Sequence, residues 1–325
     1  AKLAHMADQS LEGIAEKQRL YQRLVSGADY LNARLLADTW CAVFMWKKDD
    51  SDRGKMCPTE NDFHKIENNP HDILPHVKSK VRCLADQYQF FHWHLAFPDV
   101  FVLPEESGQA ENEQTGWCGG FNVVLGNPPW ERIKIQEKEW FGERRPDIAK
   151  AQNAATRRRM IKALADEDPQ LALDFQNALR QAEGDSHFVR DSQRYPLCGR
   201  GDLNTYQLFA EVNWRIVALN GRVGCILPCG IATDNTTRLF FQQALQQKAI
   251  VRILGFINEE MLFPSVLHNF KFCLLILSGA NGKPFEPDIV FNCYNVKHLE
   301  DKMRHFTVSL QDVNLLNPNT GTCPV

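Results

Sequence analysis

The first 120 residues alternate between helical patterns and polar stretches. Across residues 1–47 apolar side chains recur at three- and four-residue steps, which predicts helix. Residues 48–70 are polar and punctuated by glycine and proline, which predicts a loop. Residues 71–97 predict a further helix that ends in a cluster of aromatic residues, and a second polar, glycine-rich loop is expected at 104–120.

After residue 120 the pattern changes to short apolar, β-branched runs separated by helical patterns. The first run, 121–125, lies between glycines and is expected to be a strand buried on both faces. Strands that alternate with helices favour an α/β fold with a largely parallel sheet. A parallel crossover needs a dozen or more residues, so the last two strands, joined by a short loop, can be antiparallel. The later expected strands are 223–227, 250–256 and 272–277, and the helical patterns are 131–181, 204–219 and 234–248.

The composition is that of an ordinary globular protein. Of the 325 residues, 44% are hydrophobic and 24% charged, and the net charge of −3 neither requires nor excludes a nucleic-acid partner. The sequence contains no apolar run long enough for a membrane span and no signal peptide, so a cytoplasmic protein without a membrane partner is expected. The ten cysteines are scattered without a CxxC pair, so they are expected to be reduced core residues, and no metal site is predicted.

The segment Gly126-Asn127-Pro128-Pro129-Trp130 directly follows the first expected strand. In open α/β sheets the ligand crevice lies outside the carboxyl ends of the strands. Two consecutive prolines fix φ, remove two hydrogen-bond donors and restrain the residues before them. The result is a stiff loop that presents carbonyl groups and one amide side chain, although it could equally be a rigid turn that ends a strand.

This inventory suits methylation of an amine conjugated to a purine ring. Such an amine is a poor nucleophile because its lone pair is delocalised. The side-chain oxygen of Asn127 and the carbonyl of Pro128 could accept its two N–H groups and favour a pyramidal nitrogen. The indole of Trp130 offers a flat face for a flipped base, a contact worth about 1–3 kcal/mol.

The run FNVVLGNPPW at 121–130 resembles motif IV of the amino-methyltransferases, a strand followed by Asn or Asp, Pro-Pro and an aromatic residue. The later segments GDLNTY at 201–206 and GRVGCILP at 221–228 also match. Together they are similar to the large methylase subunits of type IIG restriction–modification enzymes and of related phage-defence DNA adenine-N6 methyltransferases. The resemblance runs from about residue 30 to residue 325.

The resemblance implies a class I (Rossmann-like) methyltransferase sheet in which residues 121–125 form the fourth strand and the last strand is antiparallel. It gives Asn127, Pro128, Pro129 and Trp130 the catalytic roles. It also implies S-adenosylmethionine as cofactor, with Gly126 and Asn127 beside it. The family's glycine-rich loop after the first strand has no counterpart here. We therefore expect the chain to be a fragment whose main cofactor motif lies upstream, and to be inactive alone.

The resemblance also predicts how the chain is divided. Residues 1–110 would be a helical segment and loops before the fourth core strand. Residues 111–280 would be the C-terminal-side part of the catalytic domain, with a helical insertion at 131–200. Residues 281–325 would connect it to a target-recognition domain, and a specificity or nuclease domain is a possible partner in the same parent chain.

Further candidates for DNA contact lie in three places. Residues 131–162 contain ten Lys or Arg and five Asp or Glu, a balance of 10 − 5 = +5, so a phosphate-tracking surface and a solvated helix face are both open. In the 201–206 segment a cleft-side loop competes with simple capping of the next helix. Near the last strand the family often has a second base-stacking aromatic residue, and a core role is the alternative. The residues concerned are Arg157, Arg158, Arg159, Asn204, Tyr206, Phe270 and Phe272.

The preferred function is methyl transfer from S-adenosylmethionine to adenine N6 of a flipped base in double-stranded DNA. One alternative keeps the chemistry and changes the substrate to a protein glutamine or to RNA, because both present a planar –NH2 group. Another is a DNA-binding module without cofactor, which the missing glycine-rich loop favours and the intact Asn127–Trp130 loop opposes.

Overall fold

The computed structural model divides the chain into two compact units, which are described separately. The first comprises residues 1–102 and 183–188, and the second comprises residues 103–182 and 189–325. Within these units the structure describes residues 3, 6, 9–49, 51, 56–104, 108–112, 115–281 and 286–324.

The first unit is helical, as the pattern predicts, with three differences. Residues 71–97, expected to form one helix, form two, which end at Tyr88 and Ala96. The first helix begins only at Leu11, where the Ser10 side chain caps it by accepting the Gly13 amide. A further helix lies within the expected loop at 48–70, and Thr59 and Asp62 form a capping box at its start. The elements are α1 (Leu11–Val25), α2 (Ala28–Met45), α4 (Glu60–Asn68), α5 (Pro75–Tyr88), α6 (Trp93–Ala96) and the short strand β1 (Phe101–Val102).

The second unit has a mixed α/β fold built on a five-stranded sheet in the order β3-β4-β6-β5-β7. β3 is parallel to β4, β5 is parallel to β7, and β6 is antiparallel to both β4 and β5. The antiparallel arrangement of the third and fourth predicted strands is therefore confirmed. The strands are β3 (Phe121–Gly126), β4 (Val217–Pro228), β5 (Ile250–Ile257), β6 (Lys271–Ser278) and β7 (Asp288–Cys293), and the short β2 (Cys118–Gly119) precedes them.

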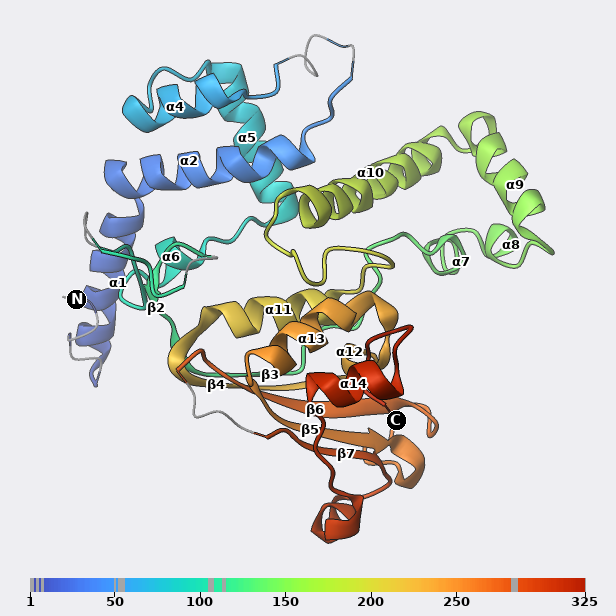
Figure 1. The fold of residues 1–325 in the computed structure, drawn as a ribbon. Coiled ribbons are helices and arrows are strands. Elements are labelled where there is room, and N and C mark those ends of the chain that lie inside the picture. Colours follow the sequence, from blue (N-terminus) through green and yellow to red (C-terminus); the bar gives the residue numbers. More distant parts are fainter. Residues whose placement is uncertain are drawn as a thin grey trace. The chain divides into compact units, whose positions relative to one another are not determined.

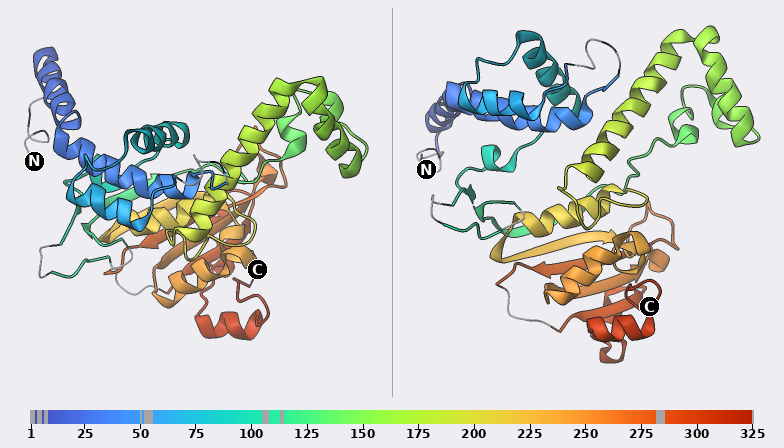
Figure 2. Two further views of the ribbon diagram at one scale, coloured as in Figure 1. Left: turned by 90° about the horizontal axis from the view of Figure 1, so that it is seen from above. Right: turned by 45° about the horizontal axis from the view of Figure 1, so that its top comes forward.

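Helices cover one face of this sheet (Figures 1 and 2). Val223, Ile253 and Leu275 point to that face and are almost completely buried. The covering helices are α11 (Thr205–Ile216), α12 (Gly230–Thr233), α13 (Arg238–Gln246) and α14 (Leu310–Leu316). Short 3-10 turns complete the loops: η1 (Asn235–Thr237), η2 (Asn258–Glu260), η3 (Val296–Glu300) and η4 (Lys302–Arg304).

The other face is open at β3, so the expectation that this strand is buried on both faces is wrong. Val123 and Leu125 are 59% and 78% exposed. Among the residues that the structure describes, only β4 pairs with β3, which makes β3 an edge strand. The burial of a strand depends on which segments pack beside it, and an apolar, β-branched run carries no information about those segments. The pattern alone therefore could not predict this exposure.

The predicted helical insertion after β3 forms its own small core. α7 (Glu137–Trp140), α8 (Pro146–Ala149), α9 (Ala154–Glu167) and α10 (Pro169–Asp191) follow one another, and α10 turns back from α9 (Figure 2). Phe141, Ile148, Leu164 and Phe175 make up its buried cluster.

Residues 281–325, expected to be a connecting segment, also contribute to the sheet. β7 pairs with β5, and α14 packs against α13. The ten cysteines are free thiols, and Cys198, Cys225, Cys229, Cys273, Cys293 and Cys323 are buried. No helix in the described ranges is both long and apolar enough to cross a membrane.

Candidate active site

The Asn127 loop leaves the sheet at the carboxyl end of β3, where Gly126 pairs with Cys225 of β4. Asn127 and Pro129 are exposed, Pro128 is buried, and Trp130 is half-buried. Within the described part of the chain, neither the Asn127 side-chain amide nor the Pro128 carbonyl takes part in a hydrogen bond. Both oxygens that the sequence predicts as acceptors therefore lack a hydrogen-bond partner among the described residues.

Thr205 holds the end of this loop in place. Its hydroxyl donates to the Pro129 carbonyl at 2.7 Å and accepts from the Glu131 amide at 2.9 Å. Its own amide donates to the Glu131 carbonyl at 2.9 Å, and the Ile133 amide donates to the Leu203 carbonyl at 3.2 Å. The Asn127 loop and the 201–206 segment thus lie side by side. Thr205, which was not predicted to be a functional residue, joins them.

The two neighbours of Thr205, which the sequence predicts to contact DNA, also contribute to the fold of α11. The side-chain oxygen of Asn204 accepts the Tyr206 amide at 3.3 Å and caps α11. Tyr206 is buried, and its burial raises the pKa of its phenol well above the ordinary range. A direct contact of either residue with DNA stays a prediction. The sequence did contain a hint of this role of Thr205. Asn204 is a typical N-cap, so Thr205 is expected to be the first residue of a helix, where a side chain can face the preceding loop.

Trp130 belongs to an aromatic cluster at the carboxyl edge of the sheet. Its ring stacks on Phe270, with centroids 5.4 Å apart and an interplanar angle of 10°. It also packs against the buried cluster of Phe256, Phe272, Val290 and Cys293. The indole Nε1 is buried and has no hydrogen-bond partner among the described residues. Phe272 is buried within the sheet and stacks on Phe256, so its predicted DNA contact does not fit this structure, whereas Phe270 is partly exposed.

The basic stretch after the loop is only partly available to phosphates. Arg157 is 11% exposed, and its Nε donates to the Glu137 carboxylate at 2.8 Å. Arg157 therefore ties α9 to α7, and its contact with a phosphate stays a prediction. Arg158 and Arg159 are exposed and remain candidates for DNA contact.

Gly126 and Asn127, the expected neighbours of S-adenosylmethionine, are both exposed at the carboxyl end of β3. A Cβ placed on Gly126 would meet no atom within 4 Å, so no described protein atom fills the space beside this backbone. Asn127 and Leu125 on either side are exposed. As for metals, no group of three His, Cys, Asp or Glu side chains in the described ranges could hold an ion.

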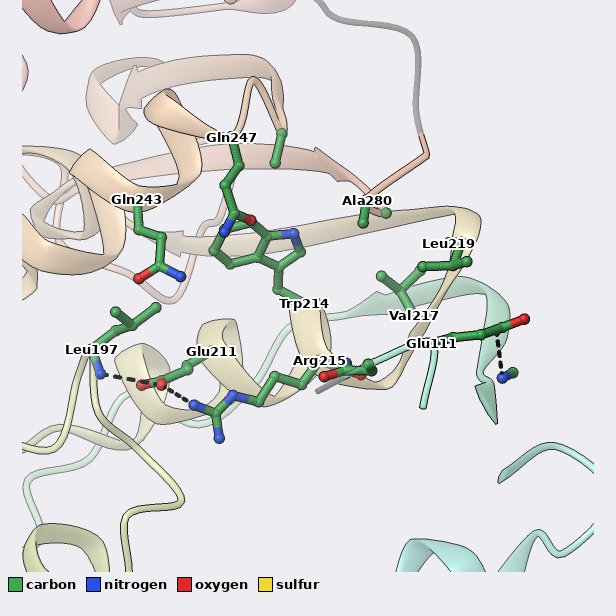
Figure 3. Close-up of a pocket in the computed structure, with 14 residues that line it drawn as sticks. Glu111, Leu197, Glu211, Trp214, Arg215, Val217, Leu219, Gln243, Gln247 and Ala280 are labelled. Carbon is green, nitrogen blue, oxygen red and sulfur yellow. Dashed lines mark hydrogen bonds and ion pairs between the residues drawn. The ribbon is translucent and has the colours of Figure 1, made fainter. Parts of the chain in front are cut away.

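A cavity of the second unit lies at the opposite ends of the strands. It has a volume of about 480 Å³ and is lined by residues that include Val217 at the start of β4 and Gly279 after the end of β6. On its floor Glu211 and Arg215 point toward each other (Figure 3). Because its lining residues begin β4 and follow β6, this cavity is distinct from the Asn127 loop.

Comparison with known proteins gives one match to a protein family. Residues 18–161 match the family described as Eco57I restriction-modification methylase. This match covers less than half of the chain and includes the Asn127–Trp130 loop. It favours a methyltransferase function. A search of curated proteins found no match.

Two solved structures illustrate the more distant similarity. The ATP-dependent Type ISP restriction-modification enzyme LlaBIII, solved bound to DNA, is 11% identical with a TM-score of 0.27. That alignment covers 77% of this chain and 12% of LlaBIII, so the chain spans a small part of that enzyme's length. A candidate class I S-adenosylmethionine-dependent methyltransferase from Listeria monocytogenes is 12% identical with a TM-score of 0.27, and 84% of this chain and 88% of that chain are covered. TM-scores this low do not bear on the function.

Proposed function

We propose that this chain is the base-binding part of a DNA methyltransferase that transfers a methyl group from S-adenosylmethionine to adenine N6. The observation that carries the proposal is the Asn127 loop. It is stiffened by two prolines, clamped by Thr205, and leaves two oxygen acceptors without internal partners beside an aromatic ring. The match of residues 18–161 to a restriction–modification methylase family supports the same chemistry.

In this proposal the chain's own residues hold and activate the amine. Asn127 Oδ1 and the Pro128 carbonyl accept the two N–H groups of adenine N6, which localises the nitrogen lone pair. No residue needs a tuned pKa as a general base, because the proton can leave after the methyl group has been transferred. S-adenosylmethionine would supply the methyl group, and the residues that bind it are expected elsewhere in the parent protein.

The product of the reaction tests this assignment. The full reading frame that contains this chain would be incubated with isotope-labelled S-adenosylmethionine and duplex DNA, and the DNA would be digested to nucleosides. We expect the label in N6-methyldeoxyadenosine, and no product from the 325-residue chain alone. Label in N4-methylcytosine, in RNA or in protein glutamine would contradict the assignment to adenine.

Replacing Thr205 with valine should slow the reaction without unfolding the protein. Valine keeps the shape but leaves the Pro129 carbonyl and the Glu131 amide without their shared partner. Each lost hydrogen bond is worth about 1 kcal/mol, so we expect turnover to fall roughly tenfold. Thr205→Ser keeps the hydroxyl and is the matched control. Equal turnover of the two variants would show that the clamp does not position the loop.

A further inference from the structure

The segment between β5 and β6, residues 258–270, is tied together by one buried side chain. Asn258 is completely buried. Its Nδ2 donates to the carbonyls of Phe263 and Val266, each at 2.9 Å, and its Oδ1 accepts the Phe263 amide at 2.9 Å. Its backbone amide donates to the Phe270 carbonyl at 3.0 Å, which closes the two ends of the segment. Buried polar groups satisfied in this way specify one conformation, so the segment forms a defined loop.

Phe270, the last residue of this loop, stacks on Trp130. The two rings are nearly parallel with centroids 5.4 Å apart, an offset stack. A base inserted between them would need the rings about 7 Å apart, twice the contact distance of carbon atoms. In this conformation Phe270 therefore occupies the indole face on which a flipped base would stack.

From this geometry we propose that Phe270 is a placeholder: its ring fills the base position on Trp130 and must leave before a base can stack there. The proposal rests on the proposed function, because it assumes that Trp130 is the base platform. The exposure of Phe270 gives the ring a route outward, since it is 36% exposed while Phe272, two residues on, is buried.

If Phe270 covers the indole in most molecules, only the remaining fraction can bind a base. The apparent affinity is then the intrinsic affinity multiplied by that open fraction. Removing the ring removes this competition. An aromatic pair contributes enough to make the expected change roughly two- to tenfold in the binding constant. A ring that instead clamped the base would have the opposite effect when removed, so the sign of the change decides between the two roles.

The test compares binding of oligo(dA) with binding of an abasic strand of the same length, using fluorescence anisotropy and the 325-residue chain. The difference between the two strands reports contacts to bases rather than to phosphates. For Phe270→Ala we expect this base-dependent affinity to rise two- to tenfold. Phe263→Ala is the matched control, because Phe263 lies on the same loop but contacts Phe272 rather than Trp130. It should leave base-dependent affinity unchanged.

The outcomes separate this inference from the proposed function. If Trp130→Ala changes nothing in either background, the indole is not a base platform and the proposed function of the site fails. If Trp130→Ala abolishes base-dependent binding while Phe270→Ala weakens it or leaves it unchanged, only the placeholder role is overturned. An equal rise in Phe263→Ala would attribute the effect to loosening of the loop and would also overturn it.

Discussion

Replacing Asn127 with alanine is expected to lower the turnover of adenine methylation by about 10²–10³-fold, the cost of losing one fixed hydrogen-bond partner of a transition state. The proposed role of this side chain is to accept one N–H of the target amine while the Pro128 carbonyl accepts the other. Asn127 is exposed and makes no hydrogen bond within the described chain, so its removal should not disturb the fold. Turnover would be measured on the full reading frame by transfer of labelled methyl groups to DNA.

Two further variants sharpen this prediction. Asn127→Asp keeps oxygen acceptors, and the resembled family allows aspartate at this position, so it should retain more activity than alanine. Asn122→Ala removes an exposed asparagine from β3, the strand before the loop, and we expect activity close to that of the wild type. If Asn127→Ala methylates adenine as fast as Asn122→Ala, the amine is not activated by this loop and the mechanism is wrong.

The sequence predicted where the strands of the second unit lie better than it predicted which segments cover them. The four apolar runs are all strands, because a run of β-branched residues between turn residues favours a strand whether or not it is buried. β7 was missed, because its sequence Asp-Ile-Val-Phe-Asn-Cys is short and follows a polar stretch. The exposure of Val123 and Leu125 was missed for a different reason, since it depends on what lies beside β3 and not on β3 itself.

At the candidate site the sequence found the loop but not its supports. Asn127 and the prolines stand out because their chemistry is unusual for a turn. Thr205 and Asn258 do not, because a threonine at a helix start and an asparagine after a strand are common in any protein. Their importance comes from contacts with Pro129 and Phe263, which only the folded chain brings within hydrogen-bonding distance.

The stability of the second unit is expected to depend strongly on Glu211, at the floor of the cavity in Figure 3. This side chain is completely buried. Its carboxylate accepts from Arg215 at 2.7 Å and from the amides of Leu197 at 3.2 Å and Cys198 at 2.8 Å. Glu211→Ala would leave two amides without an acceptor and a largely buried guanidinium without its counter-ion. Breaking a buried pair from one side costs about 3–5 kcal/mol of unfolding free energy.

Glutamine at this position should cost less than alanine, and the difference tests the physical reason. Burial raises the pKa of Glu211 despite the nearby Arg215, so the buried negative charge carries a desolvation cost that glutamine avoids. Glu211→Gln keeps the shape and one acceptor for the Leu197 or Cys198 amide. Urea unfolding of both variants would be compared with Glu259→Ala, which removes an exposed ion pair to His268 and should cost at most about 1 kcal/mol. Glu211→Ala and Glu259→Ala could instead unfold at the same urea concentration. The loss of the buried network would then cost no more than the loss of a solvated ion pair, and the network would not hold α11 to the 197–198 segment.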